Sequence, residues 1–181
     1  MTDLASTTGT WTIDPTHTTI GFSARHAMVA KVRGRFEDFA GEFVLDGASP
    51  SASTANLTVQ LASIDTKNAD RDAHLKSAEF FDVETFPTMT FTSTSVEGSG
   101  PKFTVHGDLS VHGVTKNIPV HFELVGVSTD PWGGTRIGFE GHAELSRKDF
   151  GLTWNVALET GGVLVSDTIK IELDVEAIKQ A

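Results

Sequence analysis

Hydrophobic and polar residues alternate along most of this chain with a period of two, which places successive side chains on opposite faces of a β-strand. The alternation is clearest in six segments, residues 18–26, 55–61, 103–111, 118–124, 137–145 and 169–175. Together with shorter alternating segments, the pattern predicts about eight strands at fairly regular spacing. Such spacing favours one all-β domain, either an up-and-down barrel or a sandwich. Because the first and last strands are both strong, we expect them to pair with each other and leave no free edge.

One segment interrupts this pattern. Residues 67–81 are rich in helix-forming side chains and show no alternation, and the sequence Asp-Val-Glu-Thr-Phe-Pro at 82–87 then ends the helical stretch. The sequence therefore predicts one helix near residues 68–78, inserted between strands and followed by Phe80 and Phe81. We expect this helix to cover the mouth of a barrel.

The composition fits a single domain with an apolar interior. The chain of 181 residues has 39% hydrophobic side chains, 17 glycines and 12 phenylalanines but no tyrosine, so aromatic packing is expected to bring no phenol hydroxyl inside. Residues 1–10 contain no apolar run, so we expect a disordered tail rather than a signal peptide, with the domain at 11–181. No stretch approaches the ~20 apolar residues that span a bilayer. We therefore expect a soluble, cytoplasmic protein without a transmembrane segment.

Charge and missing residue types exclude several kinds of site. The formal net charge of −10 disfavours nucleic acid and anionic membranes as partners. Without cysteine, the chain has no disulfide, thiol nucleophile or thiolate ligand. Its seven histidines form no H-x-H or H-E-x-x-H motif, and no G-x-S-x-G occurs. We therefore expect no metal site, no cofactor and no catalytic residues.

Motifs spread along the chain carry a resemblance to a known family. They include Trp-Thr-Ile-Asp-Pro-Thr-His at 11–17, Phe-Ser-Ala-Arg-His at 22–26, Arg-Asp-Ala-His-Leu-Lys-Ser at 71–77, Phe-Pro-Thr-Met-Thr-Phe at 86–91, Gly-Asp-Leu-Ser-Val-His-Gly-Val-Thr-Lys at 107–116 and Arg-Lys-Asp-Phe-Gly-Leu at 147–152. With these motifs in this order, the sequence resembles the YceI-like family. The resemblance implies an antiparallel eight-stranded lipocalin-like barrel whose apolar tunnel holds an isoprenoid or similar lipid. Many family members are exported, whereas this chain begins with a polar segment.

The alternation and the resemblance together predict which side chains face the interior and contact such a ligand. The apolar set is Ile20, Phe22, Ala24, Phe43, Leu57, Val59, Leu61, Phe91, Phe103, Val105, Leu109, Val120, Phe122, Ile137 and Phe139. A packed core without a ligand is the alternative interpretation of the same residues. His26 falls on the face of Ile20 and Phe22, and we predict that it hydrogen-bonds a polar head group or, equally, serves as a structural histidine.

A second set is predicted to lie at the mouth of the barrel. It consists of Arg71, His74, Phe80, Phe81 and Arg147. Arg71 and His74 are one helical turn apart and could contact a polar head group together. The alternative is that they attach the helix to the rim of the barrel. For Arg147 a structural role in a charged bend is the stronger interpretation.

These observations lead to three functional hypotheses. The first is a protein without catalytic activity that binds, stores or transports a long apolar lipid, of the isoprenoid quinone or polyprenyl phosphate type. The second is an enzyme that acts on such a lipid, with His26 or His74 as acid or base. The third is a ligand-free interaction module, with a homodimer as one form.

Overall fold

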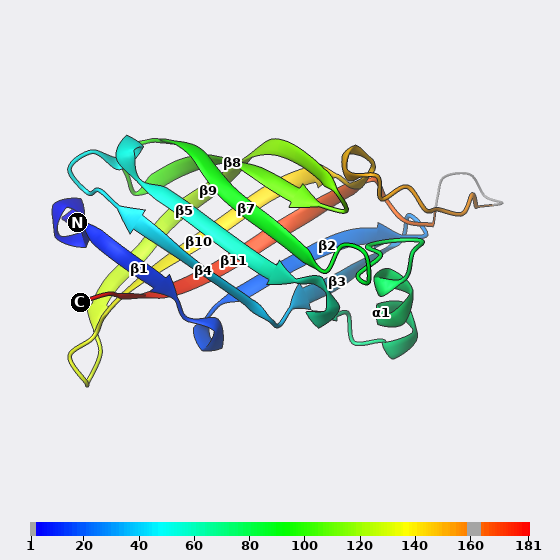
Figure 1. Ribbon diagram of the computed structural model, residues 1–181, viewed down its shortest axis with the longest axis horizontal. Helices are drawn as coiled ribbons and strands as arrows, with labels where there is room; N and C mark the ends of the chain where they lie inside the picture. The colour runs from blue at the N-terminus through cyan, green and yellow to red at the C-terminus, as the bar shows by residue number, and fades with distance from the viewer. Residues whose placement is uncertain (1–2, 159–163) are drawn as a thin grey trace.

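The computed structural model describes residues 3–158 and 164–181. Its strands are β1 (Gly9–Ile13), β2 (Thr19–His26), β3 (Ala30–Phe36), β4 (Phe39–Leu45), β5 (Thr54–Gln60), β6 (Ile64–Asp65), β7 (Thr88–Glu97), β8 (Lys102–Val111), β9 (Val114–Thr129), β10 (Thr135–Ser146) and β11 (Thr168–Lys179) (Figure 1). Its helices are α1 (Ala69–Lys76) and the 3-10 helices η1 (Leu4–Thr7), η2 (Pro15–His17), η3 (Pro50–Ala52), η4 (Leu61–Ser63) and η5 (Arg147–Phe150). No helix in the described part of the chain is long and apolar enough to cross a membrane.

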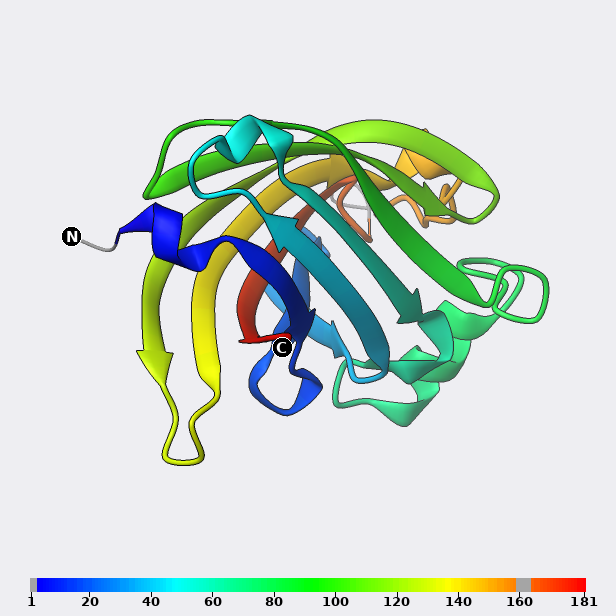
Figure 2. The same cartoon turned by 60° about the vertical axis from the view of Figure 1, so that its left-hand side comes forward.

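Eight of these strands close into an antiparallel barrel, which confirms the predicted fold. In ring order they are β1, β4, β5, β7, β8, β9, β10 and β11, and β1 closes the ring by pairing with β11. Trp11 thus lies opposite Phe43 on one side and Lys179 on the other. The first strand predicted from the alternation, at 18–26, does pair with the last strand, but the ring itself is closed by β1, which the sequence pattern did not predict. Figure 2 shows the strands curving round one end of the barrel.

The remaining strands form an extension of the barrel sheet. Beside β11, strand β1 occupies the stretch Ala177–Lys179, and β2 occupies the stretch Lys170–Asp174. β3 pairs with β2, and the short β6 pairs with β3. The chain therefore leaves the ring between β1 and β2, so the strong alternation at 18–26 belongs to the extension rather than to the ring.

The turns and the helix follow from their local sequences. His112 and Gly113 both have positive φ, +56° and +74°, and so form the two-residue turn that joins β8 to β9. The helix begins after Asn68, whose side chain accepts a hydrogen bond from the Arg71 N–H. As predicted, α1 lies between strands, and it falls within the predicted range of 68–78. It is the one α-helix of the described residues.

Residues 3–10 are part of the folded domain rather than a disordered tail. The Asp3 carboxylate accepts a hydrogen bond from Ala5 N and starts η1, and the Thr7 side chain is only 1% exposed. The buried Trp11 indole donates to the Thr7 carbonyl over 2.9 Å. The polar composition of residues 1–10 gave no sign that the segment is folded. The reason is that the acceptor for a buried indole can be the backbone carbonyl of any residue type.

Candidate ligand cavity

The barrel encloses an apolar cavity of about 220 Å³. Eleven of the side chains predicted to contact a ligand line it: Ile20, Phe22, Phe43, Leu57, Phe91, Phe103, Val105, Leu109, Val120, Phe122 and Phe139. Residues on the same alternating patterns, such as Met89, Ile118 and Leu173, also line it and could have been found by extending the same period. Leu4 and Thr7 could not, because the segment that holds them carries no strand pattern.

The other predicted contacts lie elsewhere. Val59, Leu61 and Ile137 are at most 1% exposed and belong to the packed core rather than to the cavity. Ala24 is half-buried, and His26 is exposed at the end of β2, where its backbone bridges Val165. Of the two expected positions of His26, inside the barrel or at a mouth, the inside position is wrong. Alternation only places residues on one face of a strand. Along β2 this face lines the cavity at Ile20 and Phe22 but reaches the protein surface at His26.

Three phenylalanines of the cavity lie against glycines of neighbouring strands. Phe22 covers Gly34, Phe91 covers Gly107 and Phe122 covers Gly141, and a Cβ added at any of these glycines would overlap the ring. The glycines therefore leave no empty space of their own. They let each ring lie along the sheet, so that the space remains in the middle of the barrel.

The cavity is bordered by a few polar residues near η1. The charged ones are Glu42 and Asp46, both acidic, and no Lys, Arg or His occurs among its described lining residues. Asp46 already accepts hydrogen bonds from the N–H groups of Ala48 and Ser49. The border therefore provides hydroxyl groups and carboxylates and no cation for an anionic group.

The end of the barrel near η1 is covered by that single turn. Leu4 lines the cavity, and its backbone lies so close to Gly47 that no Cβ would fit there. η1 and the residue after it are held by hydrogen bonds from Gly47 N to Thr8 Oγ1, from Lys179 Nζ to the Ser6 carbonyl and from the Trp11 indole. The cover at this end is therefore thin, in the sense that one short turn held by a few hydrogen bonds closes it.

The opposite end of the barrel lies near α1 (Figure 1). Leu61, Ile64, Phe150 and Leu152 are buried there in one cluster, and Phe81 packs on its edge. None of Arg71, His74, Phe80, Phe81 and Arg147, the predicted mouth residues, lines the cavity. The helix therefore covers the packed end and not an entrance to the cavity.

Arg71 attaches α1 to the strand before it. Its guanidinium donates to the Thr66 hydroxyl over 2.8 Å and to the Thr66 carbonyl over 2.6 Å. Asp72 completes the attachment by accepting from the Thr66 N–H and hydroxyl. His74 meets the rings of Phe80 and Trp154 edge-on at 5.2 and 4.7 Å. This end is held together by polar and aromatic contacts between α1 and the loops.

Arg147 is a buried cation that holds a loop. The residue is 3% exposed and donates to the carbonyls of Leu152, Trp154, Val165 and Ser166. Burial lowers the pKa of Arg147 from its ordinary value, and the charge of Asp167 opposes that effect. With its N–H groups given to these carbonyls, Arg147 joins η5 to residues on both sides of the adjoining loop.

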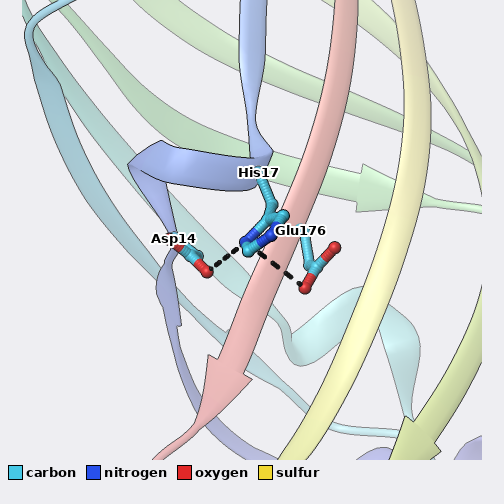
Figure 3. A group of neighbouring side chains, drawn as sticks. All are labelled: Asp14, His17 and Glu176. Carbon is cyan, nitrogen blue, oxygen red and sulfur yellow. Dashed lines mark hydrogen bonds and ion pairs between the residues drawn. The ribbon is translucent and has the colours of Figure 1, made fainter. Parts of the chain in front are cut away.

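A second polar cluster joins β1, η2 and β11 on the outside of the barrel (Figure 3). Asp14 lies 2.8 Å from His17, and Glu176 lies 4.0 Å from the same imidazole, so three possible metal ligands meet. The Arg136 guanidinium bonds both carboxylates, at 2.9 and 2.8 Å. The positive charge of this cluster is thus supplied by Arg136. The cluster fixes the corner between β1 and β2.

The hydrogen bonds of this cluster change the acidity of Asp14. Burial acts to raise the pKa of Asp14, but the hydrogen bonds from His17, Thr16 and Arg136 together outweigh it and hold the pKa well below its usual range. The hydrogen bonds of Arg136 to Asp14, Glu176 and Asp130 raise the pKa of Arg136. The motif Asp-Pro-Thr-His at 14–17 is therefore a structural corner.

A closed eight-stranded antiparallel barrel around an apolar cavity defines a class of barrels just wide enough to hold one small ligand. Within this class, the chain belongs to the YceI-like domain family, which it matches over residues 11–177. The resemblance seen in the motifs is thereby confirmed.

Relatives and solved structures agree with this assignment. Protein YceI of Salmonella newport is 38% identical over 164 residues, 91% of this chain and 83% of that protein. The YceI protein of Campylobacter jejuni is 31% identical and superposes with a TM-score of 0.73 over 87% of this chain and 90% of its own. A polyisoprenoid binding domain from Saccharophagus degradans shares the fold at 16% identity, with a TM-score of 0.71 over 94% of this chain and 98% of its own.

Proposed function

We propose that this protein binds and carries one long, apolar molecule of the isoprenoid type, without chemical conversion of its ligand. The observation that carries the proposal is the cavity inside a closed barrel, lined by phenylalanine and aliphatic side chains from most strands of the sheet. Burial of each methylene group in such surroundings contributes about 0.8 kcal/mol. The description of the Saccharophagus degradans domain as polyisoprenoid binding supports the same ligand class.

The ligand that fits best has a neutral head group. Glu42 and Asp46 are the charged residues at the border of the cavity, and no basic side chain lines it among the described residues. A phosphate would lie beside these negative charges. It would also lose its hydration without gaining a positively charged partner, which costs free energy. A quinone carbonyl or an alcohol can instead accept from, or donate to, hydroxyl groups such as that of Ser53. We therefore favour a neutral isoprenoid over a polyprenyl phosphate.

A long chain requires the cavity to widen. Its 220 Å³ is below the ~300–1,000 Å³ of pockets that bury drug-sized ligands. The rings of Phe22, Phe91 and Phe122 already lie against glycines of the wall, so widening requires other lining side chains, such as Phe103 and Phe139, to change rotamer. The thin cover at η1 is the end at which we expect the ligand to enter.

Native mass spectrometry of the purified protein, followed by solvent extraction, tests the proposal. We expect one added mass per chain that extracts as a neutral isoprenoid, or one that appears after exposure to isoprenoid quinones and alcohols. Extraction of a polyprenyl phosphate would overturn the neutral head group. A chain that stays bare after exposure to all of these compounds would overturn the carrier and favour the ligand-free interaction module.

Glycine substitutions locate the ligand inside the barrel. Alanine at Gly107 or Gly141 would push the ring of Phe91 or Phe122 toward the middle of the cavity, and we expect ligand occupancy to fall at least tenfold. Gly126→Ala is the matched control, because nothing lies within 4 Å of a Cβ there. Equal occupancy in all three variants would place the ligand outside the cavity. No specific observation favours catalysis, since His26 and His74 do not line the cavity.

A further inference from the structure

Two exposed histidines face each other on the outer surface of the barrel. His121 of β9 and His142 of β10 are direct Cα partners, and their ring centres lie 5.2 Å apart. Glu172 of β11 is the next partner in the row, opposite His142, and Thr104 of β8 is the partner of His121. All lie in a wide groove on this side of the sheet, so the row is open to ions in solution.

The spacing of the rings suits a shared metal ion. Zn²⁺ binds histidine nitrogen at about 2.0–2.1 Å in tetrahedral geometry, which places the centres of two bound imidazoles roughly 5 Å apart. His121 Nδ1 lies 3.1 Å from the Thr104 hydroxyl. A bond from Nδ1–H to that oxygen leaves Nε2 with its lone pair, and such outer partners orient metal-binding histidines. Glu172 is exposed, so its carboxylate can rotate toward the pair.

The row of side chains on one side of this pair is acidic, whereas on the other side Glu144 is paired with Lys170. In the next row along the same surface, Glu123 lies opposite Glu140, and Glu140 lies opposite Asp174. Like charges in directly opposite positions destabilise a sheet, and Lys102, opposite Glu123, is the basic residue at the end of this row. A bound divalent ion would reduce this repulsion. The cluster of Asp14, His17 and Glu176 differs, because Arg136 already occupies its carboxylates.

We propose that His121 and His142, with Glu172 as a third ligand, bind one divalent transition-metal ion of the class that prefers imidazole, such as Zn²⁺. The site is on the outer face of β9, β10 and β11. It is therefore separate from the lipid cavity and does not depend on the proposed function.

Titration of the untagged, full-length chain with zinc chloride, followed by calorimetry, tests this site. We expect one ion per chain, with affinity at least tenfold lower in His142→Ala and in His121→Ala and lowered less in Glu172→Gln. His26→Ala and His17→Ala are matched controls that should bind as the parent does. Circular dichroism of each apo variant checks that it is folded.

Three outcomes would overturn the proposal. They are an absence of zinc binding at millimolar metal, equal binding in His142→Ala and the parent, and loss of binding in His17→Ala alone. The last result would move the ion to the Asp14 cluster. Electron paramagnetic resonance of the Cu²⁺ form gives a second readout, since two imidazole nitrogens are expected in the parent and one in each single histidine variant.

Discussion

The two ends of the barrel are built in different ways. Near α1, Leu61 is 0% exposed and Phe150 is 1% exposed, and the buried guanidinium of Arg147 bonds the carbonyls of four residues. Near η1, the same sheet surrounds an apolar cavity that is covered by one short turn carrying Leu4. A second buried cluster, which includes Trp11 and Ile137, packs beside the cavity, and the Trp11 indole bonds the Thr7 carbonyl of η1. The barrel can therefore hold a cavity because packed clusters around it fix its strands.

Removing the guanidinium of Arg147 should break the packed end most severely. In Arg147→Met, four carbonyl groups lose their donor. Because an unsatisfied buried acceptor costs about 1–3 kcal/mol, we expect the free energy of unfolding to fall by roughly 3–5 kcal/mol in urea titrations. Lys148→Met is the matched control, since Lys148 is the exposed neighbour.

The same variant separates structure from ligand binding. Ligand bound per folded molecule should be unchanged in Arg147→Met, because Arg147 does not line the cavity. If the variant kept its stability and lost the ligand, Arg147 would be a head-group contact and the assignment of the two ends would be reversed.

One substitution made at both ends sharpens the comparison. Leu61→Ala empties space in the packed cluster, and we expect a loss of about 3 kcal/mol with no change in bound ligand. Leu57→Ala lies beside space that already exists, so its loss should be nearer to 1 kcal/mol, while the amount or length of bound ligand changes. Urea unfolding and native mass spectrometry measure the two effects. Equal losses of stability would mean that the two ends are packed alike.

Alternation in the sequence predicts strands but not which stretch of the barrel is hollow. Period-two patterning predicted about eight strands in a barrel or a sandwich, and the family resemblance implied the eight-stranded barrel, which β1 and β11 close. Val59 and Leu57 share a strand and a face, yet Leu57 lines the cavity and Val59 is buried in the cluster next to it. That distinction depends on what fills the end of the barrel, and residues such as Phe150 come from distant segments.

The placement of the helix shows the same limit. The helix-forming residues at 67–81 and their lack of alternation predict α1. They do not show that Phe150 and Trp154 reach the same end, since their contacts with His112 and His74 join residues far apart in the chain. The segment at 3–8 carried no pattern at all, so the cover at the other end had no local signal.

A substitution at the junction of β1 and β2 tests the region between the two ends. Asp14→Asn removes the carboxylate that His17, Thr16 and Arg136 contact, and its side chain is only 11% exposed. Hydrogen bonds to charged groups contribute about 1.5–3 kcal/mol, so we expect a loss of about 2 kcal/mol at pH 7. Ligand binding should remain, because Asp14 does not line the cavity.

The effect of Asp14→Asn should also depend on pH. Since folding lowers the pKa of Asp14, the unfolded chain takes up the proton first as the pH falls. The contribution of Asp14 is thus complete above about pH 4, the ordinary value for a carboxyl group, and is lost progressively below it. Urea unfolding at pH 7 and at pH 3 should give a smaller difference between parent and variant at the lower pH. A constant difference would mean that the carboxylate is not specially stabilised.

The smallest change in stability is expected at the thin cover. Leu4→Ala shortens a half-buried side chain that touches the cavity and lies 2.7 Å from where a Cβ on Gly100 would sit. The free energy of unfolding should fall by less than about 1 kcal/mol, because few contacts hold η1. Ligand exchange should nevertheless become severalfold faster, measured as the rate at which a labelled isoprenoid replaces the bound one. Ala5→Ser, an exposed change in the same turn, is the control. Exchange that is unchanged in Leu4→Ala but faster in a variant that loosens α1, such as Arg71→Ala, would place the entrance at the packed end and show that this end opens in solution.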